Sequence, residues 1–167
     1  QFAGEHRDRL EHVQIYRPED LALFHDLDVV ASVQPVFIPT DWKPADKRWG
    51  PERCRNAYAW KSMLQTGLRL QFGSDAPVES INPLYGIHAA VTRQTVSGEP
   101  PGGWHPEQKL SLEDSITGFT AVAAWSSRRE DRLGSIEPGK WADLTVYSQD
   151  LFGLPPDEWL DVETEIT

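Results

Sequence analysis

The stretch Asp28-Val-Val-Ala-Ser-Val-Gln-Pro35 is an almost continuous apolar run that ends at a proline. A run of this kind, without polar alternation, is typical of a strand buried on both faces of a parallel sheet. Working outward, Leu68-Arg-Leu-Gln-Phe72 predicts a second strand, which breaks directly into Gly73-Ser-Asp-Ala-Pro77. On the other side, residues 9–15 are β-compatible, with apolar side chains at alternate positions at Val13 and Ile15, and predict a further strand.

Helical patterns separate and follow these strands. Helix-start residues, apolar residues at helical spacing and terminal glycines predict helices over residues 19–27, 53–67, 83–96 and 112–128. Residues 40–51 and 98–106 are rich in Trp, Pro or Gly and predict loops. Strands that alternate with helices predict an α/β fold of right-handed parallel units, and both an open sheet and a closed barrel are compatible with it.

The tail of the chain has a different pattern. Pro138-Gly139 predicts a turn between Ile136 and a strand over residues 143–147, because proline suits the first central position and glycine the second. The tail therefore predicts a small hairpin-like β element that stands apart from the alternating strands and helices.

Composition excludes several classes of protein. The 167 residues include 39% hydrophobic residues and carry a net charge of −10, so we expect no nucleic-acid or anionic-membrane partner. The single cysteine, Cys54, leaves no intrachain disulfide and no cysteine-rich metal motif, so any metal ligands would be His and carboxylate. Residues 1–5 carry no signal-peptide core, and a cytoplasmic location is the expectation.

Two ionisable residues stand where parallel α/β proteins carry their chemistry, at the carboxyl ends of strands. His12 lies in the first predicted strand, and Asp75 directly follows the strand that ends at Phe72. An imidazole and a carboxylate in these places suit a divalent metal or an acid–base pair that activates water. The alternatives are a hydrogen-bonded structural histidine and an aspartate that only holds its own turn.

The remaining polar candidates are weaker. His25 and His88 fall in predicted helices, where surface or rim positions are expected, and Arg93 falls on what would be an exposed helix face. Cys54 lies between two arginines, but no His and acid pattern accompanies it, so catalysis through this thiol is not expected. A phosphate-binding loop is also disfavoured, because Asp75 places an acid where the phosphate would lie.

Six stretches together carry a resemblance to a known family. They are residues 9–14 (RLEHVQ), 32–35 (SVQP), 57–60 (AYAW), 72–77 (FGSDAP, with Asn82-Pro83 after it), 90–93 (AVTR) and 134–144 (GSIEPGKWADL). In order and spacing they resemble the second half of amidohydrolase family 3, of the YtcJ-like branch. The resemblance covers essentially the whole chain.

This resemblance implies the C-terminal part of a metal-dependent (β/α)₈ barrel, about strands six to eight. It implies that residues 1–130 belong to the barrel and residues 131–167 to part of an accessory β-sandwich. His12 resembles the metal ligand of strand six. Asp75 resembles the aspartate of strand eight, which binds the metal or orients its water and takes the proton. The implied cofactor is a divalent metal, with zinc expected.

The resemblance also implies a function. It indicates a hydrolase that cleaves a C–N bond of a small amide, such as an N-acyl or N-formyl compound, through a metal-activated water. Strands one to five have no counterpart, so the chain alone is expected to be inactive, and Arg93 and Trp104 are candidates for contacts with substrate. The alternative is a non-catalytic remnant that self-associates through exposed barrel edges, for instance as a homodimer.

Overall fold

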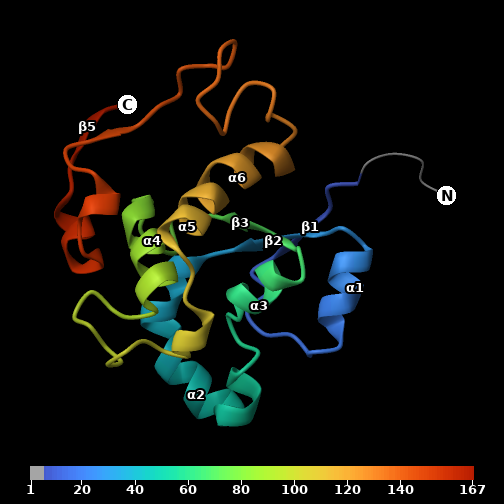
Figure 1. Cartoon of the computed structure of the whole chain (residues 1–167). Helices are drawn as coiled ribbons and strands as arrows, with labels where there is room; N and C mark the ends of the chain where they lie inside the picture. Colours follow the sequence, from blue (N-terminus) through green and yellow to red (C-terminus); the bar gives the residue numbers. More distant parts are fainter. Residues whose placement is uncertain (1–5) are drawn as a thin grey trace.

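A three-stranded parallel sheet lies at the centre of the computed structural model, which describes residues 6–167 (Figure 1). Residues 1–5, on which the signal-peptide prediction falls, lie outside the described residues. The strands are β1 (Arg9–Glu11), β2 (Val30–Val33) and β3 (Arg69–Phe72), in the order β1-β2-β3. The three predicted parallel strands are therefore confirmed, and β2 is the middle one.

Burial follows the apolar pattern of the strands. All four residues of β2 are buried, whereas all three residues of β1 are exposed. In β3 only Leu70 and Phe72 are buried, because alternate side chains of this strand face opposite sides of the sheet. The unbroken apolar run therefore belongs to β2, which among the described strands of this sheet has a neighbour on each side.

Helices and short 3₁₀ turns surround the sheet. The helices are α1 (Asp20–Asp26), α2 (Ile38–Cys54), α3 (Trp60–Gln65), α4 (Pro83–Thr92), α5 (Leu112–Phe119) and α6 (Ala121–Ser126). The 3₁₀ turns are η1 (Pro35–Phe37), η2 (Pro106–Gln108), η3 (Leu151–Gly153) and η4 (Pro156–Asp161). In Figure 1, α5 and α6 run along one side of the sheet, and the segment after α6 extends away from it.

The loop predicted over residues 40–51 is wrong, because this segment lies within α2. Pro39 lies in the first turn, where a missing N–H costs nothing, and Pro44 lies inside the helix. Gly50, at φ 78°, breaks the helix, and Pro51 starts the short piece that follows. Pro39 and Pro51 therefore stand at the starts of the two pieces, while Pro44 is accommodated inside the first piece.

Three predicted helices have different bounds in the structure. The helix predicted over residues 53–67 begins only at Trp60, because Tyr58 takes a left-handed conformation at φ 50°. The helix predicted over residues 83–96 ends at Thr92, since Arg93 caps it with φ 57°. The helix predicted over residues 112–128 is divided into α5 and α6 at Thr120, whose φ and ψ of −119° and −86° are not helical.

The tail forms a turn without the predicted hairpin. The Pro138-Gly139 turn is present, with the Lys140 amide donating to the Glu137 carbonyl at 3.2 Å and Gly139 at φ 94°. However, β4 (Val146–Tyr147) pairs antiparallel with β5 (Thr164–Ile166), and not with the residues before the turn. The strand predicted over residues 143–147 is thus shorter, and its partner comes from the end of the chain.

A second apolar cluster attaches the tail to the rest of the molecule. Leu151, Trp159 and Val162 pack against Leu84 and Ile87 of α4. The Trp159 indole N–H donates to the Leu151 carbonyl at 2.9 Å, which satisfies its polar atom inside the cluster. The division at residue 130 stays a prediction. Within residues 6–167, no helix combines the length and the apolar character that a membrane span needs.

Candidate functional site

His12 lies at the carboxyl end of the sheet, directly after β1 and not within it as the sequence predicted. The His12 amide extends the ladder by donating to the Ser32 carbonyl at 2.7 Å, and the chain then reverses. The Val13 amide donates to the Glu11 carbonyl at 2.9 Å across His12, whose φ is 71°. A tight turn of this kind is rare and strained for a non-glycine residue, and such strain concentrates at functional sites.

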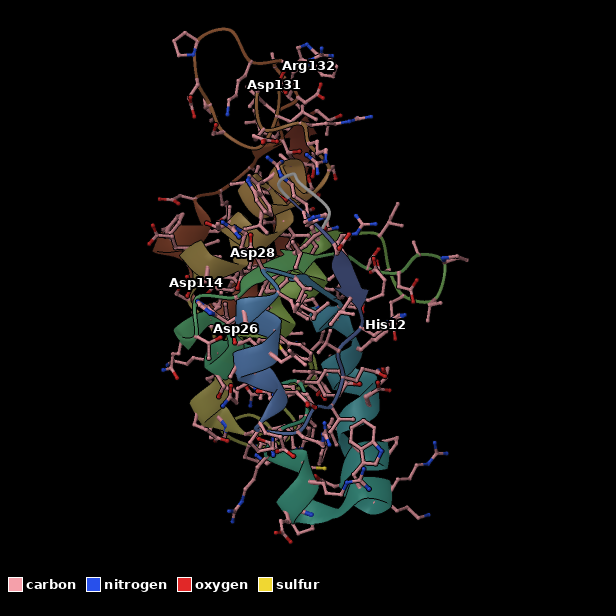
Figure 2. The ribbon with its side chains drawn as sticks, turned by 90° about the vertical axis from the view of Figure 1, so that its right-hand side faces the viewer. His12, Asp26, Asp28, Asp114, Asp131 and Arg132 are labelled. Atoms are coloured by element: carbon pink, nitrogen blue, oxygen red, sulfur yellow. The ribbon has the colours of Figure 1, made fainter. Side chains whose placement is uncertain are left out.

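Two neighbours orient the imidazole of His12. Its Nδ1 lies 2.9 Å from Oε1 of Gln34, the residue that follows β2, and its ring stacks on Phe37 with centroids 6.2 Å apart. His12 itself is exposed, whereas Gln34 is only 6% exposed. Figure 2 shows His12 on the opposite side of the view from Asp28, which precedes β2. Sequence reasoning did not single out Gln34, although its place at a strand end was a usable signal.

Asp75 lies at the same edge of the sheet, in the loop that follows β3. Its φ is 56°, its carbonyl accepts from the Val78 amide at 2.9 Å, and it is exposed. Because β2 separates β1 from β3, His12 and Asp75 follow strands that are about 10 Å apart across the sheet. The structure thus brings both predicted residues to one edge, each in a left-handed turn.

A polar network lies beside this edge and was not predicted. The Gln14 amide donates to the Tyr58 hydroxyl at 2.7 Å and to Asp41 Oδ2 at 3.2 Å, and the Tyr58 hydroxyl donates to the same carboxylate. Burial, with the Asp41 carboxylate, holds the pKa of Tyr58 well above its usual range. The Tyr58 hydroxyl therefore stays protonated and serves as a hydrogen-bond donor.

Arg93 and Trp104, the two candidates for substrate contacts, lie in the core. Arg93 is fully buried, so the exposed helix face expected for it is wrong. Its guanidinium donates to the carbonyls of Tyr58 and Trp104, and burial lowers its pKa to about 9. The Trp104 indole N–H donates to Asp46 Oδ1 at 3.0 Å. These contacts join residues on three separate loops and helices, which is a structural role.

The other titratable candidates divide between core and surface. His25 is exposed, as predicted, but His88 is only 6% exposed, so the surface position expected for it is wrong. Cys54 is buried, and burial together with the nearby Asp46 carboxylate raises the pKa of its thiol. A buried thiol with a raised pKa is a poor nucleophile, in agreement with the argument against catalysis through Cys54.

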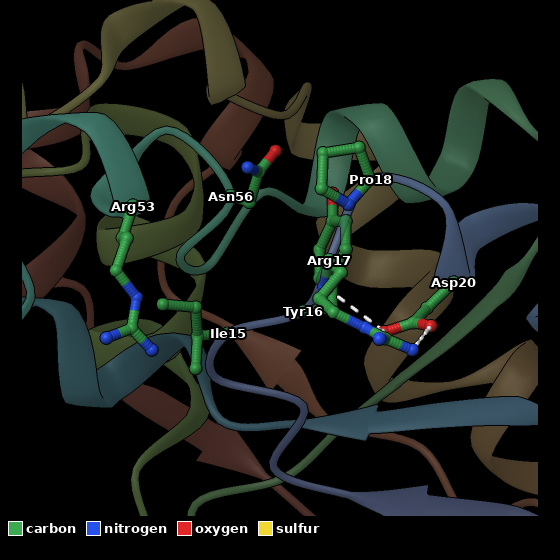
Figure 3. Close-up of a pocket in the computed structure, with 7 residues that line it drawn as sticks. All are labelled: Ile15, Tyr16, Arg17, Pro18, Asp20, Arg53 and Asn56. Atoms are coloured by element: carbon green, nitrogen blue, oxygen red, sulfur yellow. Dashed lines mark hydrogen bonds and ion pairs between the residues drawn. The ribbon is translucent and has the colours of Figure 1, made fainter.

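A hollow of about 340 Å³ lies next to the loop that leaves His12 (Figure 3). Its walls are Ile15, Tyr16, Arg17, Pro18, Asp20, Arg53 and Asn56. Arg17 is paired with Asp20 through two hydrogen bonds, of 3.0 and 2.7 Å, to its carboxylate. Neither His12 nor Asp75 lines this hollow, so it is separate from the predicted site.

Comparison with known proteins identifies the family. A model described as "Amidohydrolase family" matches residues 2–167, which is nearly the whole chain. The chain belongs to the amidohydrolase family.

This amidohydrolase chain is similar to several curated proteins over most of its length. It is 36% identical over 145 residues to Protein LONG AFTER FAR-RED 3 of Arabidopsis thaliana, covering 86% of the chain and 24% of that protein. It is 32% identical over 153 residues to YtcJ of Bacillus subtilis, covering 92% and 29%. N-substituted formamide deformylase of Arthrobacter pascens is 30% identical over 146 residues, covering 85% and 26%. The amidohydrolase chain thus spans less than a third of the length of these relatives.

Solved structures agree with this assignment. An uncharacterized metal-dependent hydrolase from Pyrococcus horikoshii superposes with a TM-score of 0.71 at 32% identity, covering 80% of the chain and 27% of that structure. An amidohydrolase from Thermotoga maritima, at 22% identity and a TM-score of 0.57, shows a similar fold. Hydrolases that depend on a metal are therefore similar to this amidohydrolase in both sequence and structure.

The donor atoms of the amidohydrolase chain fit a metal in type but not in number. Imidazole nitrogen and carboxylate oxygen are both ligands that zinc takes in proteins, and His12 and Asp75 supply one of each at a single edge. Three or more protein ligands are usual. In the part of the chain that the structure describes, no group of three His, Cys, Asp or Glu residues could hold an ion. The described residues thus supply two donor atoms of suitable type at one edge of the sheet.

Proposed function

We propose that this chain contributes His12 and Asp75 to the site of a metal-dependent hydrolase that cleaves the C–N bond of a small amide. In this proposal the chain is the C-terminal portion of a (β/α)₈ barrel, about strands six to eight, and residues 131–167 belong to a β-sandwich. The observation that carries the proposal is the place of the two side chains. Each follows a parallel strand at the carboxyl edge, where barrel enzymes hold their active sites.

Each residue has a distinct role in this proposal. His12 would offer its Nε2 as a ligand to a divalent metal, with zinc expected. When bound, the metal would supply a water of lowered pKa and a polarised substrate carbonyl. The Asp75 carboxylate, exposed in its turn, accepts the proton of the attacking water and delivers it to the leaving nitrogen. The deformylase relative supports an N-formyl or N-acyl amide as the substrate class.

The test compares zinc content and amide hydrolysis in the chain alone and in a longer protein that contains it. We expect tight zinc and hydrolysis of N-formyl and N-acyl amides only in the longer protein, since two ligands are too few. There, Asp75→Asn should lower kcat about 100-fold or more, because a positioned general base contributes at least that factor.

Asp28→Asn is the matched control, since Asp28 lies before β2 at the other end of the sheet (Figure 2). It should leave kcat unchanged. An active chain with one tightly bound zinc would contradict the incomplete site, and full activity of Asp75→Asn would remove the proposed role of Asp75.

A second candidate function is self-association of a non-catalytic chain. The observation that favours it is β1, whose three residues are all exposed and which pairs, among residues 6–167, only with β2. A strand with one free edge can pair with a strand of a second copy.

A further inference from the structure

Gln34 is a buried polar residue at the carboxyl edge of the sheet, and its side chain contacts His12. It follows the strand directly, and Pro35 restricts it to an extended backbone, with φ −121° and ψ 91°. It is 6% exposed, yet its side-chain oxygen lies 2.9 Å from Nδ1 of the exposed His12. A buried amide is thus aimed at an exposed imidazole that comes from another strand.

The atom that faces the imidazole determines where the ring carries its proton. An amide oxygen only accepts hydrogen bonds, so Nδ1 must be the donor in the 2.9 Å contact. In the neutral ring this leaves Nε2 without a proton and with a free lone pair. Within residues 6–167, no hydrogen bond to Nε2 of His12 is formed, and the residue is exposed.

We infer that Gln34 is a positioning residue that holds His12 as the Nδ1–H tautomer, with the Nε2 lone pair open at the carboxyl edge. The inference deepens the proposed function, since only an unprotonated nitrogen can bind a metal. The stacked Phe37 ring fixes the plane of the imidazole, and Gln34 fixes its proton. The turn at His12 holds the backbone in place for both contacts.

The chain offers variants that separate this role from a general effect on folding. Gln34→Leu keeps the approximate size of the side chain and removes the acceptor. Gln34→Glu keeps an acceptor oxygen and adds no donor, so it should rescue the tautomer. Gln71→Leu is the matched control, because Gln71 is a glutamine of the same sheet whose side-chain oxygen accepts from Ser126 and not from His12.

The first measurement is the ¹⁵N NMR spectrum of the His12 ring in the metal-free chain, at a pH where the imidazole is neutral. The signals are assigned by their loss in His12→Asn. We expect Nδ1 to have the shift of a protonated nitrogen and Nε2 that of an unprotonated one, in the wild type, Gln34→Glu and Gln71→Leu. Gln34→Leu should lose this pattern. A protonated Nε2 in the wild type, or an unchanged pattern in Gln34→Leu, would overturn the inference.

The second measurement is the Zn²⁺ affinity of the longer protein that contains the chain, followed at the same ring nitrogens, because the two ligands of the chain alone are too few for tight binding. Loss of a group that orients a metal-binding histidine typically weakens metal binding by about 10- to 100-fold, so Gln34→Leu should fall in this range and Gln34→Glu should not. If the tautomer changes as expected but no Zn²⁺ binds at Nε2, Gln34 keeps its role and the proposed metal function fails. If Zn²⁺ binds at Nε2 equally in all variants, the positioning role fails and the metal function stands.

Discussion

Single residues hold this molecule together through buried polar groups. Arg93 is the largest example, since its fully buried guanidinium donates to two backbone carbonyls and lies over the Trp60 and Trp104 rings at 5.3 and 5.5 Å. The carbonyls belong to Tyr58 and Trp104, on segments that are far from each other in sequence. The arginine therefore links two loops, whose Tyr58 and Trp104 rings also contact each other with centroids 5.8 Å apart.

Replacing Arg93 by methionine should lower the free energy of unfolding by about 3 kcal/mol, because two buried carbonyls lose their donor. Urea denaturation measures this change. Arg53→Met is the matched control: Arg53 is exposed, and its replacement should change the free energy by less than about 0.5 kcal/mol. Equal effects of the two substitutions would show that the buried contacts of Arg93 do not stabilise the fold.

His88 makes stability depend on pH. Burial lowers the pKa of its imidazole, and the Asp157 carboxylate of η4 opposes this shift only in part. Below about pH 6.5 the unfolded chain takes up a proton at this residue while the folded chain does not, so stability falls as the pH falls. His88→Gln should therefore reduce the loss of stability between about pH 7.5 and 5.5, measured by urea midpoints at each pH.

The exposed His25 is the control for that measurement, since His25→Gln should leave the pH dependence of the midpoint as it is in the wild type. If His88→Gln shows the same acid sensitivity as the wild type, the neutral buried imidazole is not a source of it.

At the scale of elements, close packing of α5 on β3 depends on a missing side chain. A Cβ at Gly118 would lie 2.9 Å from two ring carbons of Phe72, a distance that real Cβ contacts avoid. Gly118→Ala should therefore cost about 1–3 kcal/mol of unfolding free energy, as overpacked cores do. Denaturation midpoints measure it.

Gly73→Ala provides the comparison for Gly118. Its added Cβ would meet nothing within 4 Å, and its φ is not in the left-handed region, so we expect a change of less than about 0.5 kcal/mol. A neutral Gly118→Ala would mean that α5 can move away from the sheet without loss.

A helix or strand could be predicted from the sequence where a single residue pattern determines it. The apolar run of residues 28–35 predicts β2 correctly, because burial on both faces leaves few alternatives. The loop predicted over residues 40–51 failed because proline starts helices as well as ending them, and only the chain around it selects between the two. The ends of the helices at Thr92 and Thr120 depend on single backbone angles that no periodicity records.

The candidate site shows the same limit. Asp75 could be predicted from the end of a strand, whereas His12 was expected within its strand and lies directly after it, and the roles of both stay a prediction. Gln34 offered only its place at a strand end as a signal, because its contact with His12 joins residues 22 apart that follow two different strands. Arg93 was expected on a surface, since a polar residue in an apolar helix usually faces water, and its two carbonyl partners come from distant loops.

At the scale of the whole molecule, the chain has a larger accessible surface area than a typical folded monomer of its mass. Its accessible area is 9957 Å², against roughly 8,300 Å² for a typical folded monomer of 18.9 kDa. Part of the exposed area is apolar, including Leu10 of β1 at 41% exposed and Ile166 of β5 at 63%. We expect a chain with this much exposed apolar surface to bury part of it against a partner.

We therefore expect the chain to associate with itself when no other partner is present. Sedimentation velocity over a range of concentrations should show species larger than a monomer. Leu10→Lys, which places a charge on the open β1 edge, should shift this distribution toward the monomer, because lysines at edges oppose strand pairing. Thr167→Lys adds the same charge at the end of the chain as a control, and a wild-type chain that stays monomeric would exclude the self-association candidate.

The left-handed turns at His12 and Asp75 also restrict what evolution or a designer can place there. At φ 71° and 56° the backbone accepts Gly, Asn, Asp and His far more readily than Val, Ile or Thr. A library randomised at these two positions would therefore be filtered twice, first by the backbone and then by chemistry. Three of the four residues that pass the first filter can donate an electron pair to a metal, so the shape of each turn favours ligand residues before any selection for activity begins.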